Sequence, residues 1–266
     1  MTTRFSRFVA LGDSQTEGLN DGDETTGVRG WADRLAEKLA EVNPDLLYAN
    51  LAISGCRARH VRTTQLDAAL ALEPDLATVV VGMNDMLRHD YDPEQTARDI
   101  EDTIVALQAA GAHVVTMTFP DIDQMLPVMR WLAPRQRALN VRVREIAARH
   151  EVPLLELSGL AMVADPRMWS HDRIHGSTEG HTRIAAGAAY VMGLPGADPS
   201  WSDVPPPNRG AVWKAAARDV RWVATFMAPW LTRQLLGRNA QEARTPKRPT
   251  LLPVRADVTA NRPAGP

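Results

Sequence analysis

The sequence predicts an α/β fold in which a parallel sheet is covered by helices on both faces. Five short runs that are apolar at both odd and even positions lie at 7–11, 46–51, 76–81, 113–118 and 153–157. Strands that are buried on both faces show this pattern. Longer segments with helical periodicity separate the runs, and this alternation indicates parallel strands joined by right-handed crossovers.

The segments between the runs carry apolar residues at steps of three and four, which is typical of helices that bury one face. These positions are Trp31, Leu35, Leu39 and Val42 in the first helix, 63–72 in the second, Ile100, Ile104 and Leu107 in the third, Leu139, Val143, Ile146 and Ala147 in the fourth, and 178–192 in the last. Asp92 with Pro93, and Pro134, mark two of the helix starts.

The length of 266 residues fits one α/β domain followed by an extension. We assign residues 1–193 to the domain and 194–207, which contain five prolines, to a linker or surface loop. Residues 208–238 form a predicted basic amphipathic helix. Residues 239–266 have no periodic pattern and are predicted to be irregular or disordered.

The charge distribution sets the C-terminal part apart from the rest. The chain has a net charge of −2, yet residues 208–266 carry 11 Lys and Arg against 3 Asp and Glu. A basic helix with a tryptophan-containing apolar stripe suggests docking on the domain, on a second copy of the chain, or peripherally on an anionic membrane. Scattered basic residues without interleaved aromatic residues argue against nucleic-acid binding.

Cysteine content and hydropathy bear on the compartment. The single cysteine, Cys56, excludes an intramolecular disulfide. The first residues lack the apolar core of a signal peptide, and no stretch of 18 apolar residues is present. We therefore expect a cytoplasmic location.

Polar residues follow four of the predicted strands at their carboxyl ends. Ser14 follows the first strand, Gly55 the second, Asn84 the third, and Asp172 and His175 come after the last. In an open parallel sheet ligands bind outside this edge. We therefore expect these five residues to lie together.

This set of side chains suits acyl transfer through a covalent intermediate. A serine hydroxyl is a weak nucleophile, so Ser14 needs a base such as His175 to accept its proton. Asp172 can orient that imidazole and stabilise its charged form. The backbone N–H groups of Ser14 and Gly55 and the side-chain amide of Asn84 can donate hydrogen bonds to the oxyanion.

The residues after the strands form four short blocks: Gly12-Asp13-Ser14, 50–55 ending in Gly55, Gly82-Met83-Asn84-Asp85, and Asp172-Arg173-Ile174-His175. In this order they resemble the blocks of the SGNH hydrolases, the superfamily of GDSL-type esterases and lipases, over residues 7–193. The resemblance implies a three-layer α/β/α, flavodoxin-like fold with a five-stranded parallel sheet in the order 2-1-3-4-5. It also implies Ser14 as nucleophile, His175 as base, Asp172 as its orienting partner, and Ser14, Gly55 and Asn84 as the oxyanion hole. Met83, where a glycine is frequent, and Gln15 depart from the pattern without removing a reacting group.

The expected function is therefore that of a serine esterase for short or medium acyl esters or acetyl groups, without a cofactor or metal. Two apolar loops, 120–131 and 158–169, suit an acyl pocket and equally suit a cover over the sheet edge. Sugar deacetylation and thioester hydrolysis stay open, as does a non-catalytic binding protein on this scaffold. A flavodoxin-like nucleotide binder and a metal pair at His171 and His175 are weaker alternatives.

Overall fold

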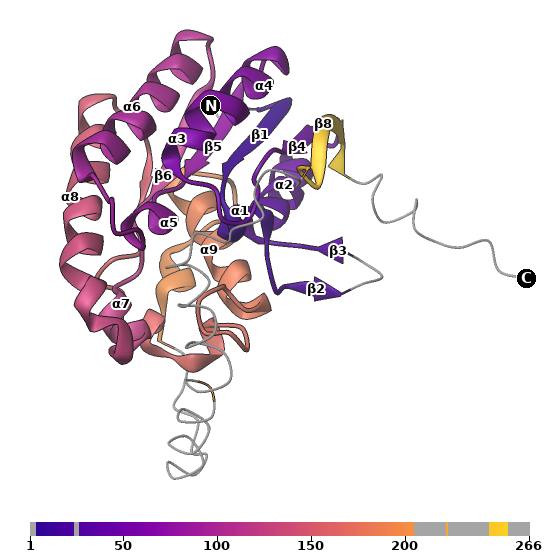
Figure 1. Cartoon of the computed structure of the whole chain (residues 1–266). Helices are drawn as coiled ribbons and strands as arrows, with labels where there is room; N and C mark the ends of the chain where they lie inside the picture. Colours follow the sequence, from indigo (N-terminus) through magenta and orange to yellow (C-terminus); the bar gives the residue numbers. More distant parts are fainter. Residues whose placement is uncertain (1–3, 24–26, 205–221, 223–244, 255–266) are drawn as a thin grey trace, which may run out of the picture.

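The computed structural model describes residues 4–23, 27–204, 222 and 245–254. Within them a six-stranded sheet has the order β7-β6-β5-β1-β4-β8, with helices on both of its faces (Figure 1). The five parallel strands are β1 (Arg7–Gly12), β4 (Leu47–Asn50), β5 (Leu76–Val80), β6 (His113–Met117) and β7 (Leu154–Leu155). They correspond to the five predicted strands and have the predicted order 2-1-3-4-5. The three-layer α/β/α prediction is confirmed.

The long helices agree with the periodic segments of the sequence. They are α2 (Trp31–Val42), α6 (Pro93–Ala109), α8 (Ala133–Arg149) and α9 (Thr178–Val191), and the segment at 63–72 is covered by a π-helical turn (Val61–Gln65) and α4 (Leu66–Ala71). The predicted start of α6 is confirmed, because the Asp92 carboxylate accepts hydrogen bonds from the backbone N–H groups of Glu94 and Gln95.

Short elements at the edge of the sheet were not predicted. They are α1 (Ser14–Glu17), the β2 (Gly22–Asp23) and β3 (Gly27–Val28) hairpin, α3 (Ala58–His60), α5 (Met83–Met86), α7 (Ile122–Met125), and 3-10 turns at Pro127–Leu132, Ala161–Ala164, Pro166–Met168 and Pro199–Ser202. None is long enough for a hydrophobic period to develop in the sequence. Two of them carry predicted site residues, since α1 contains Ser14 and α5 contains Asn84.

The apolar side chains form two buried clusters. The main cluster surrounds the sheet and includes Phe8, Leu11, Leu76 and Leu155. The second cluster lies under the 120–131 loop and consists of Met86, Ile122, Leu126, Met129, Leu132, Ala133 and Trp222. None of the helices in the described ranges is long and apolar enough to cross a membrane.

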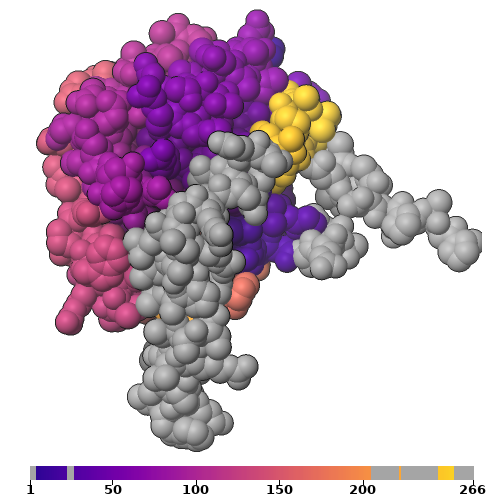
Figure 2. Space-filling model, viewed as in Figure 1, coloured from indigo at the N-terminus to yellow at the C-terminus, as the bar shows by residue number. Residues whose placement is uncertain are grey.

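The prediction that residues 239–266 are irregular is wrong for one part. Residues Arg248–Pro253 form β8, which pairs antiparallel with β4 at the edge of the sheet and is yellow in Figures 1 and 2. An isolated run with two prolines does not look like a strand, but an edge strand tolerates proline because one side of it needs no hydrogen bonds. The predicted helix at 208–238 lies outside the described residues, apart from Trp222.

Two basic side chains attach this segment to the domain. The Arg248 guanidinium is buried, donates to the Tyr48 carbonyl at 2.7 Å, and lies 5.3 Å from the centre of the Tyr48 ring. The Lys247 ammonium donates to the carbonyl oxygens of Glu17 (2.5 Å) and Val28 (3.1 Å) and to the Asp33 carboxylate (2.6 Å). The segment therefore contacts both the sheet edge and the last residue of α1.

We expect Arg248→Ala to lower the free energy of unfolding by about 2 kcal/mol, because it leaves buried carbonyl groups without their charged donor. Urea unfolding measures this change. The control is Arg137→Ala, which removes a surface ion pair to Asp123 and should change stability by less than about 0.5 kcal/mol. Equal effects of the two substitutions would contradict the anchoring role of Arg248.

Candidate active site

Ser14 stands at the carboxyl end of the central strand β1, as the first residue of α1. The Asp13 carboxylate caps this helix by accepting a hydrogen bond from the Gln15 N–H at 3.1 Å. Gly12 has a φ of +155°, and a Cβ there would lie 2.4 Å from the Val80 carbonyl oxygen and 2.6 Å from the Thr16 hydroxyl. Only glycine fits this turn, which therefore sets where the Ser14 hydroxyl lies.

The turn that carries Asp172 and His175 brings both side chains to Ser14. His175 Nε2 lies 2.8 Å from Ser14 Oγ, and His175 Nδ1 lies 2.6 Å from Asp172 Oδ2. The turn is tight, with Arg173 at a φ of +59°. Asp172 is 2% exposed, and Ser14 and His175 are each 8% exposed. The three side chains thus form a buried Ser–His–Asp arrangement with the geometry of a catalytic triad.

The Asp172 carboxylate is held ionised by its surroundings. Burial alone would raise its pKa, but the hydrogen bond from the His175 ring and those from the backbone N–H groups of His175 and Ile174 hold the pKa well below its usual value. A carboxylate fixed in this form keeps the imidazole in one tautomer and stabilises the imidazolium that forms during acyl transfer.

Asn20 is a site residue that sequence reasoning missed. Its side-chain amide donates to Asp172 Oδ2 at 2.5 Å, the same oxygen that contacts His175. Its backbone has a φ of +69°, a conformation in which asparagine is enriched. In the sequence Asn20 looks like an ordinary turn residue before Asp21 and Gly22, and no spacing relates it to Asp172, 152 positions later.

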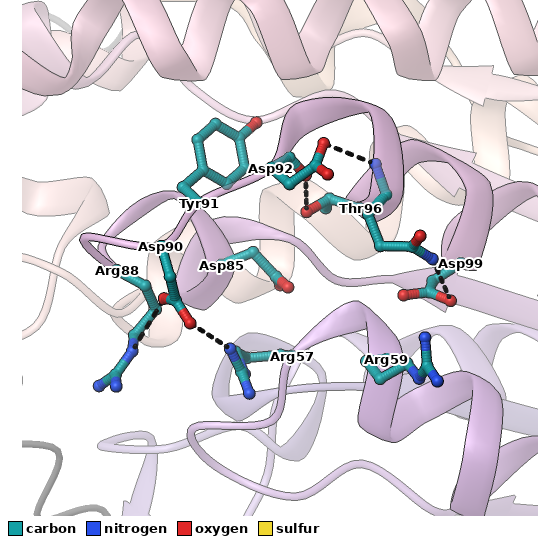
Figure 3. Close-up of a pocket in the computed structure, with 10 residues that line it drawn as sticks. Arg57, Arg59, Asp85, Arg88, Asp90, Tyr91, Asp92, Thr96 and Asp99 are labelled. Carbon is teal, nitrogen blue, oxygen red and sulfur yellow. Dashed lines mark hydrogen bonds and ion pairs between the residues drawn. The ribbon is translucent and has the colours of Figure 1, made fainter.

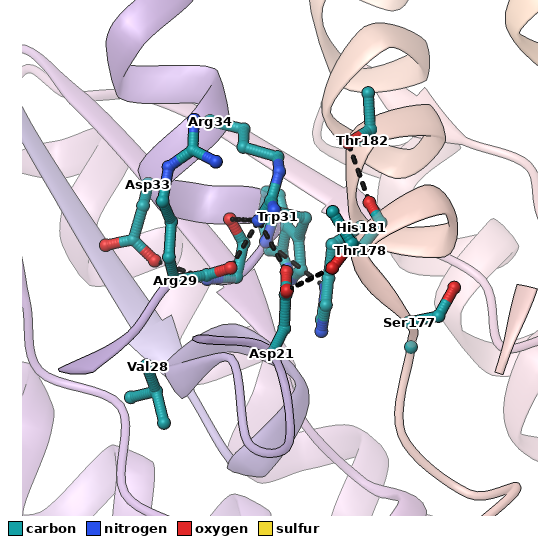
Figure 4. A network of polar contacts seen from close by, with 12 residues as sticks. Asp21, Val28, Arg29, Trp31, Asp33, Arg34, Ser177, Thr178, His181 and Thr182 are labelled. Atoms are coloured by element: carbon teal, nitrogen blue, oxygen red, sulfur yellow. Dashed lines mark hydrogen bonds and ion pairs between the residues drawn. The ribbon is translucent and has the colours of Figure 1, made fainter. Parts of the chain in front are cut away.

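A buried polar network holds the segment after Asn20 against the helices (Figure 4). Asp21 pairs with Arg34 of α2 at 2.7 Å and accepts a hydrogen bond from the Thr178 hydroxyl of α9 at 2.6 Å. His181 accepts from the Trp31 N–H at 3.2 Å, and burial lowers its pKa to about 4, so it is neutral. The network joins the Asn20 loop to the helix that starts just after His175.

Of the predicted oxyanion donors, Gly55 lies in the loop before α3 and Asn84 lies in α5. The Asn84 amide donates to the Cys56 carbonyl at 3.0 Å and to the Asp13 carboxylate at 3.2 Å. Gly55 has a φ of +81°, and the preceding Ser54 is held by hydrogen bonds from its N–H and hydroxyl to the Glu17 carboxylate of α1. The structure thus brings the Gly55 loop and α5 against the segment that carries Ser14.

Gln65 is a second residue that the sequence did not indicate. Its side-chain amide accepts from the Gly12 N–H and donates to the Gly12 carbonyl, both at 2.9 Å. This reciprocal pair fixes the strand end from which Ser14 projects. The available signal was a polar residue at a buried position of an apolar helical pattern, and Gln65 is indeed 3% exposed.

Three buried groups near the site titrate abnormally. Burial raises the pKa of Asp13 to about 6, that of Asp85 to about 7 and that of the Cys56 thiol to about 12. Asp85 accepts a hydrogen bond from the Ala58 N–H at 3.0 Å, so it braces the loop that follows Gly55. A thiol with so high a pKa is a packing group rather than a nucleophile.

No group of three or more His, Cys, Asp or Glu residues in the described part of the chain could hold a metal ion. His175 contacts Asp172 and Ser14 through its two ring nitrogens. The geometry fits nucleophilic acyl transfer by a serine.

Comparisons with known proteins agree with this geometry. Residues 10–183 match the model of the GDSL-like lipase/acylhydrolase family. The fold is similar to that of LAE5, an α/β hydrolase enzyme from the metagenome of Lake Arreo in Spain (TM-score 0.60, 21% identity, 71% of this chain and 95% of that chain). It is also similar to Axe2, an acetylxylan esterase from Geobacillus stearothermophilus (TM-score 0.58, 18% identity, 75% of this chain and 97% of that chain). A third similar structure is that of TesA (TM-score 0.59, 22% identity, 70% of this chain and 98% of that chain). No curated protein sequence matches the chain.

We expect Asn20→Gly to lower kcat/KM for ester hydrolysis about 10- to 100-fold, because a hydrogen bond to a charged group contributes about 1.5–3 kcal/mol. Glycine accepts the positive φ, so the substitution removes the amide without straining the backbone. Steady-state kinetics measures the loss. The control is Asn208→Gly in the C-terminal extension. If Asn20→Gly were as active as the wild type, Asp172 would not need the Asn20 amide.

Asp85 makes the stability of the folded protein depend on pH. The folded protein keeps a proton on Asp85 up to about pH 7, whereas the unfolded chain loses it near the ordinary value of 3.8. Ionisation of this buried group therefore lowers stability as the pH rises from about 4 to 7.

We expect Asp85→Asn to gain stability relative to the wild type over that window, by about 1–3 kcal/mol. Urea unfolding at pH 5 and pH 8 measures the difference. Asp102→Asn, at an exposed surface carboxylate, is the control and should show no such gain. If the free energy of unfolding of Asp85→Asn fell with pH as steeply as that of the wild type, Asp85 would not be the group with the raised pKa.

Proposed function

The chain belongs to the GDSL-like lipase/acylhydrolase family, and we propose that its Ser14, His175 and Asp172 form the catalytic triad of an esterase for short-chain carboxylic esters. Membership of this family, together with the fold, identifies the protein as a serine hydrolase that acts on esters. The observation that carries the residue roles is the pair of contacts, 2.8 Å and 2.6 Å, that connects Ser14 Oγ through the His175 ring to Asp172.

In the first half-reaction Ser14 Oγ attacks the ester carbonyl carbon while its proton passes to His175 Nε2. The tetrahedral intermediate collapses, the C–O bond to the alcohol breaks, and the alcohol leaves with the proton from His175. A water molecule then attacks the acyl group on Ser14, again with His175 as base. The carboxylic acid is released, and Ser14 regains its proton.

The negative charge on the carbonyl oxygen needs donors that are in place before the reaction. The Asn84 amide is oriented by the Cys56 carbonyl and the Asp13 carboxylate, and the Ser14 N–H lies at the start of α1. One amide hydrogen of Asn84 can pass from its longer contact, that to Asp13 at 3.2 Å, to the oxyanion. A donor held this close to its place of action lowers the barrier because little reorientation is needed when charge develops. This arrangement supports the assignment of Ser14 and Asn84 to the oxyanion hole, and Gly55 is assigned to it from its place after the second strand.

The apolar surroundings of the triad support a short acyl group. Met83, next to Asn84, and Ile174, next to His175, both pack against the second apolar cluster. Leu126 and Met129 of the 120–131 loop are buried within that cluster, so a long acyl chain directed toward this loop would have to displace them. The description of Axe2 as an acetylxylan esterase supports the acetyl group as one such acyl group.

We expect Ser14→Ala to reduce kcat for p-nitrophenyl acetate by more than about 10³-fold and to abolish labelling by a fluorophosphonate probe. Asn84→Ala should retain labelling but lose about 10²- to 10³-fold in kcat. Ser200→Ala, at an exposed serine, is the matched control. Full hydrolysis by Ser14→Ala would rule out the proposed mechanism.

The acyl preference is tested by p-nitrophenyl esters from acetate to octanoate. We expect kcat/KM to fall by at least about tenfold from C2 to C8, because accommodating the longer chain would require buried apolar side chains to move. The Ser14→Ala protein corrects for background hydrolysis. A profile that rises with chain length would overturn the short-chain assignment.

A further inference from the structure

Lys247 contacts both ends of the 17–28 segment, which begins three residues after the nucleophile. Its ammonium donates to the Glu17 carbonyl at 2.5 Å, at the end of α1, and to the Val28 carbonyl at 3.1 Å, at the end of β3. Its third hydrogen bond goes to the Asp33 carboxylate of α2 at 2.6 Å. An ammonium has three N–H donors, so each of them has an acceptor here.

This contact comes from outside the part of the chain that matches the family. The family model covers residues 10–183, whereas Lys247 directly precedes β8. The mechanism described above makes no use of it. The side chains of Lys247 and Asp33 are each only 18% exposed, so their ion pair is less screened by water than a surface pair.

The nucleophile is close to the carbonyl that Lys247 binds. Ser14 is the first residue of α1 and Glu17 is the last, and the Glu17 N–H donates to the Asp13 carbonyl at 2.9 Å, which closes this single turn. The last carbonyl groups of a helix have no partner within the helix, so a donor from elsewhere is needed to fix them. Lys247 supplies that donor for α1.

A first route to the other reacting groups runs through Glu17. Its carboxylate accepts hydrogen bonds from the N–H (2.7 Å) and the hydroxyl of Ser54, the residue before Gly55. The other end of this loop is held by Asp85, which accepts from the Ala58 N–H at 3.0 Å beside a polar cavity of about 180 Å³ (Figure 3). A displacement of Glu17 would therefore move the Gly55 end of the loop relative to the end that is held.

A second route runs through the turn that carries Asn20. The Asp21 N–H donates to the Gly18 carbonyl at 3.1 Å, and the Asp21 carbonyl accepts from the Arg29 N–H at 2.8 Å. These bonds connect the turn to the residues that follow the two backbone acceptors of Lys247. Asn20 in turn donates to the carboxylate of the triad at 2.5 Å.

We propose that Lys247 is a positioning residue for ester hydrolysis, which holds Ser14, the Gly55 loop and Asn20 in one arrangement. The proposal rests on the esterase function proposed above and adds a residue to it. The ammonium touches no reacting atom, and it acts by fixing two backbone carbonyls against α2. Catalysis therefore depends on the docking of the C-terminal segment 247–253 on the domain.

The test is Lys247→Met, which keeps an apolar stem and removes the ammonium. We expect kcat for p-nitrophenyl acetate, per folded molecule, to fall about 10- to 100-fold with KM within about threefold of wild type, because misplaced groups slow the chemical step more than they weaken binding. Urea unfolding gives the folded fraction. Lys38→Met, the same change on α2, is the matched control and should keep the wild-type kcat. A folded Lys247→Met protein with the wild-type kcat would overturn the proposal.

If Lys247→Met does not fold, Lys247→Arg decides the question. It keeps the positive charge beside Asp33, but a planar guanidinium cannot direct three donors from one nitrogen to three acceptors. We expect its kcat to fall at least about threefold, since the two carbonyls are then held less well. A wild-type kcat in this variant would overturn the proposal.

Chemical rescue separates the ammonium from the strand that carries it. In Lys247→Cys, the thiolate displaces bromide from 2-bromoethylamine, and the resulting thioether ends in an amine at the position of the lysine ammonium. The chain's own cysteine, Cys56, is buried with its pKa raised to about 12, so it should react little, and treated wild type is the control. We expect alkylation to raise the kcat of Lys247→Cys at least about fivefold. No recovery after complete alkylation, checked by mass spectrometry, would overturn the proposal.

Hydrogen exchange keeps this result separate from the proposed function, because it needs no turnover. In the full chain, Lys247→Met should speed exchange of the Gly18 and Ser54 amides at least about tenfold and leave α8 unchanged. Faster exchange at these amides supports the hold of Lys247 on α1, even if the wild type hydrolyses no ester. Unchanged exchange would overturn the proposal, even if the wild type hydrolyses p-nitrophenyl acetate.

Discussion

A single buried carboxylate, that of Asp172, sets the requirements for the rest of the site. Out of water it stays ionised only because donors surround it: the His175 ring, the Asn20 amide, the Ser170 hydroxyl and two backbone N–H groups. Each donor has its own support. The Asn20 loop is tied to α2 and α9 through Asp21, and the backbone donors belong to the tight turn itself. The position of His175, and through it that of Ser14, follows from these contacts.

The nucleophile is fixed from three other directions. Gln65 holds both backbone groups of Gly12, Glu17 connects α1 to the Gly55 loop, and Lys247 binds the carbonyl at the end of α1. These contacts come from parts of the chain that are far apart in sequence. They give the short α1 a definite position that four residues could not maintain alone, since an isolated helix of that length is unstable.

The sequence was sufficient for the features that repeat or that follow a strand. The five parallel strands and the long helices were predicted, because burial on both faces and helical periodicity leave a pattern in the residues. The order of the strands came from the family resemblance. Ser14, Asp172 and His175 were found because each follows a strand, and the structure brings them together. Their catalytic roles stay predictions, as do those of Gly55 and Asn84.

The parts that were missed depend on contacts without a local pattern. Asn20 acts through a hydrogen bond to a residue 152 positions away, and Gln65 through two hydrogen bonds to a residue 53 positions away. Nothing near them in the sequence indicates those partners. The strand β8 is stabilised by Arg248 against Tyr48, 200 positions earlier, rather than by the pattern of its own six residues. Sequence periodicity reports burial, but it does not report which distant group a polar side chain contacts.

The place of β8 in the chain has a consequence for how the molecule is made. β4 is complete by residue 50, but its antiparallel neighbour is synthesised only at residues 248–253. At about 5–20 residues per second, a ribosome needs at least about ten seconds to reach it. During that interval one side of β4 lacks its partner, and an uncovered strand edge can pair with other chains. The late strand therefore sets a period in which the nascent protein is exposed to aggregation, and this period ends when Lys247 and Arg248 bind.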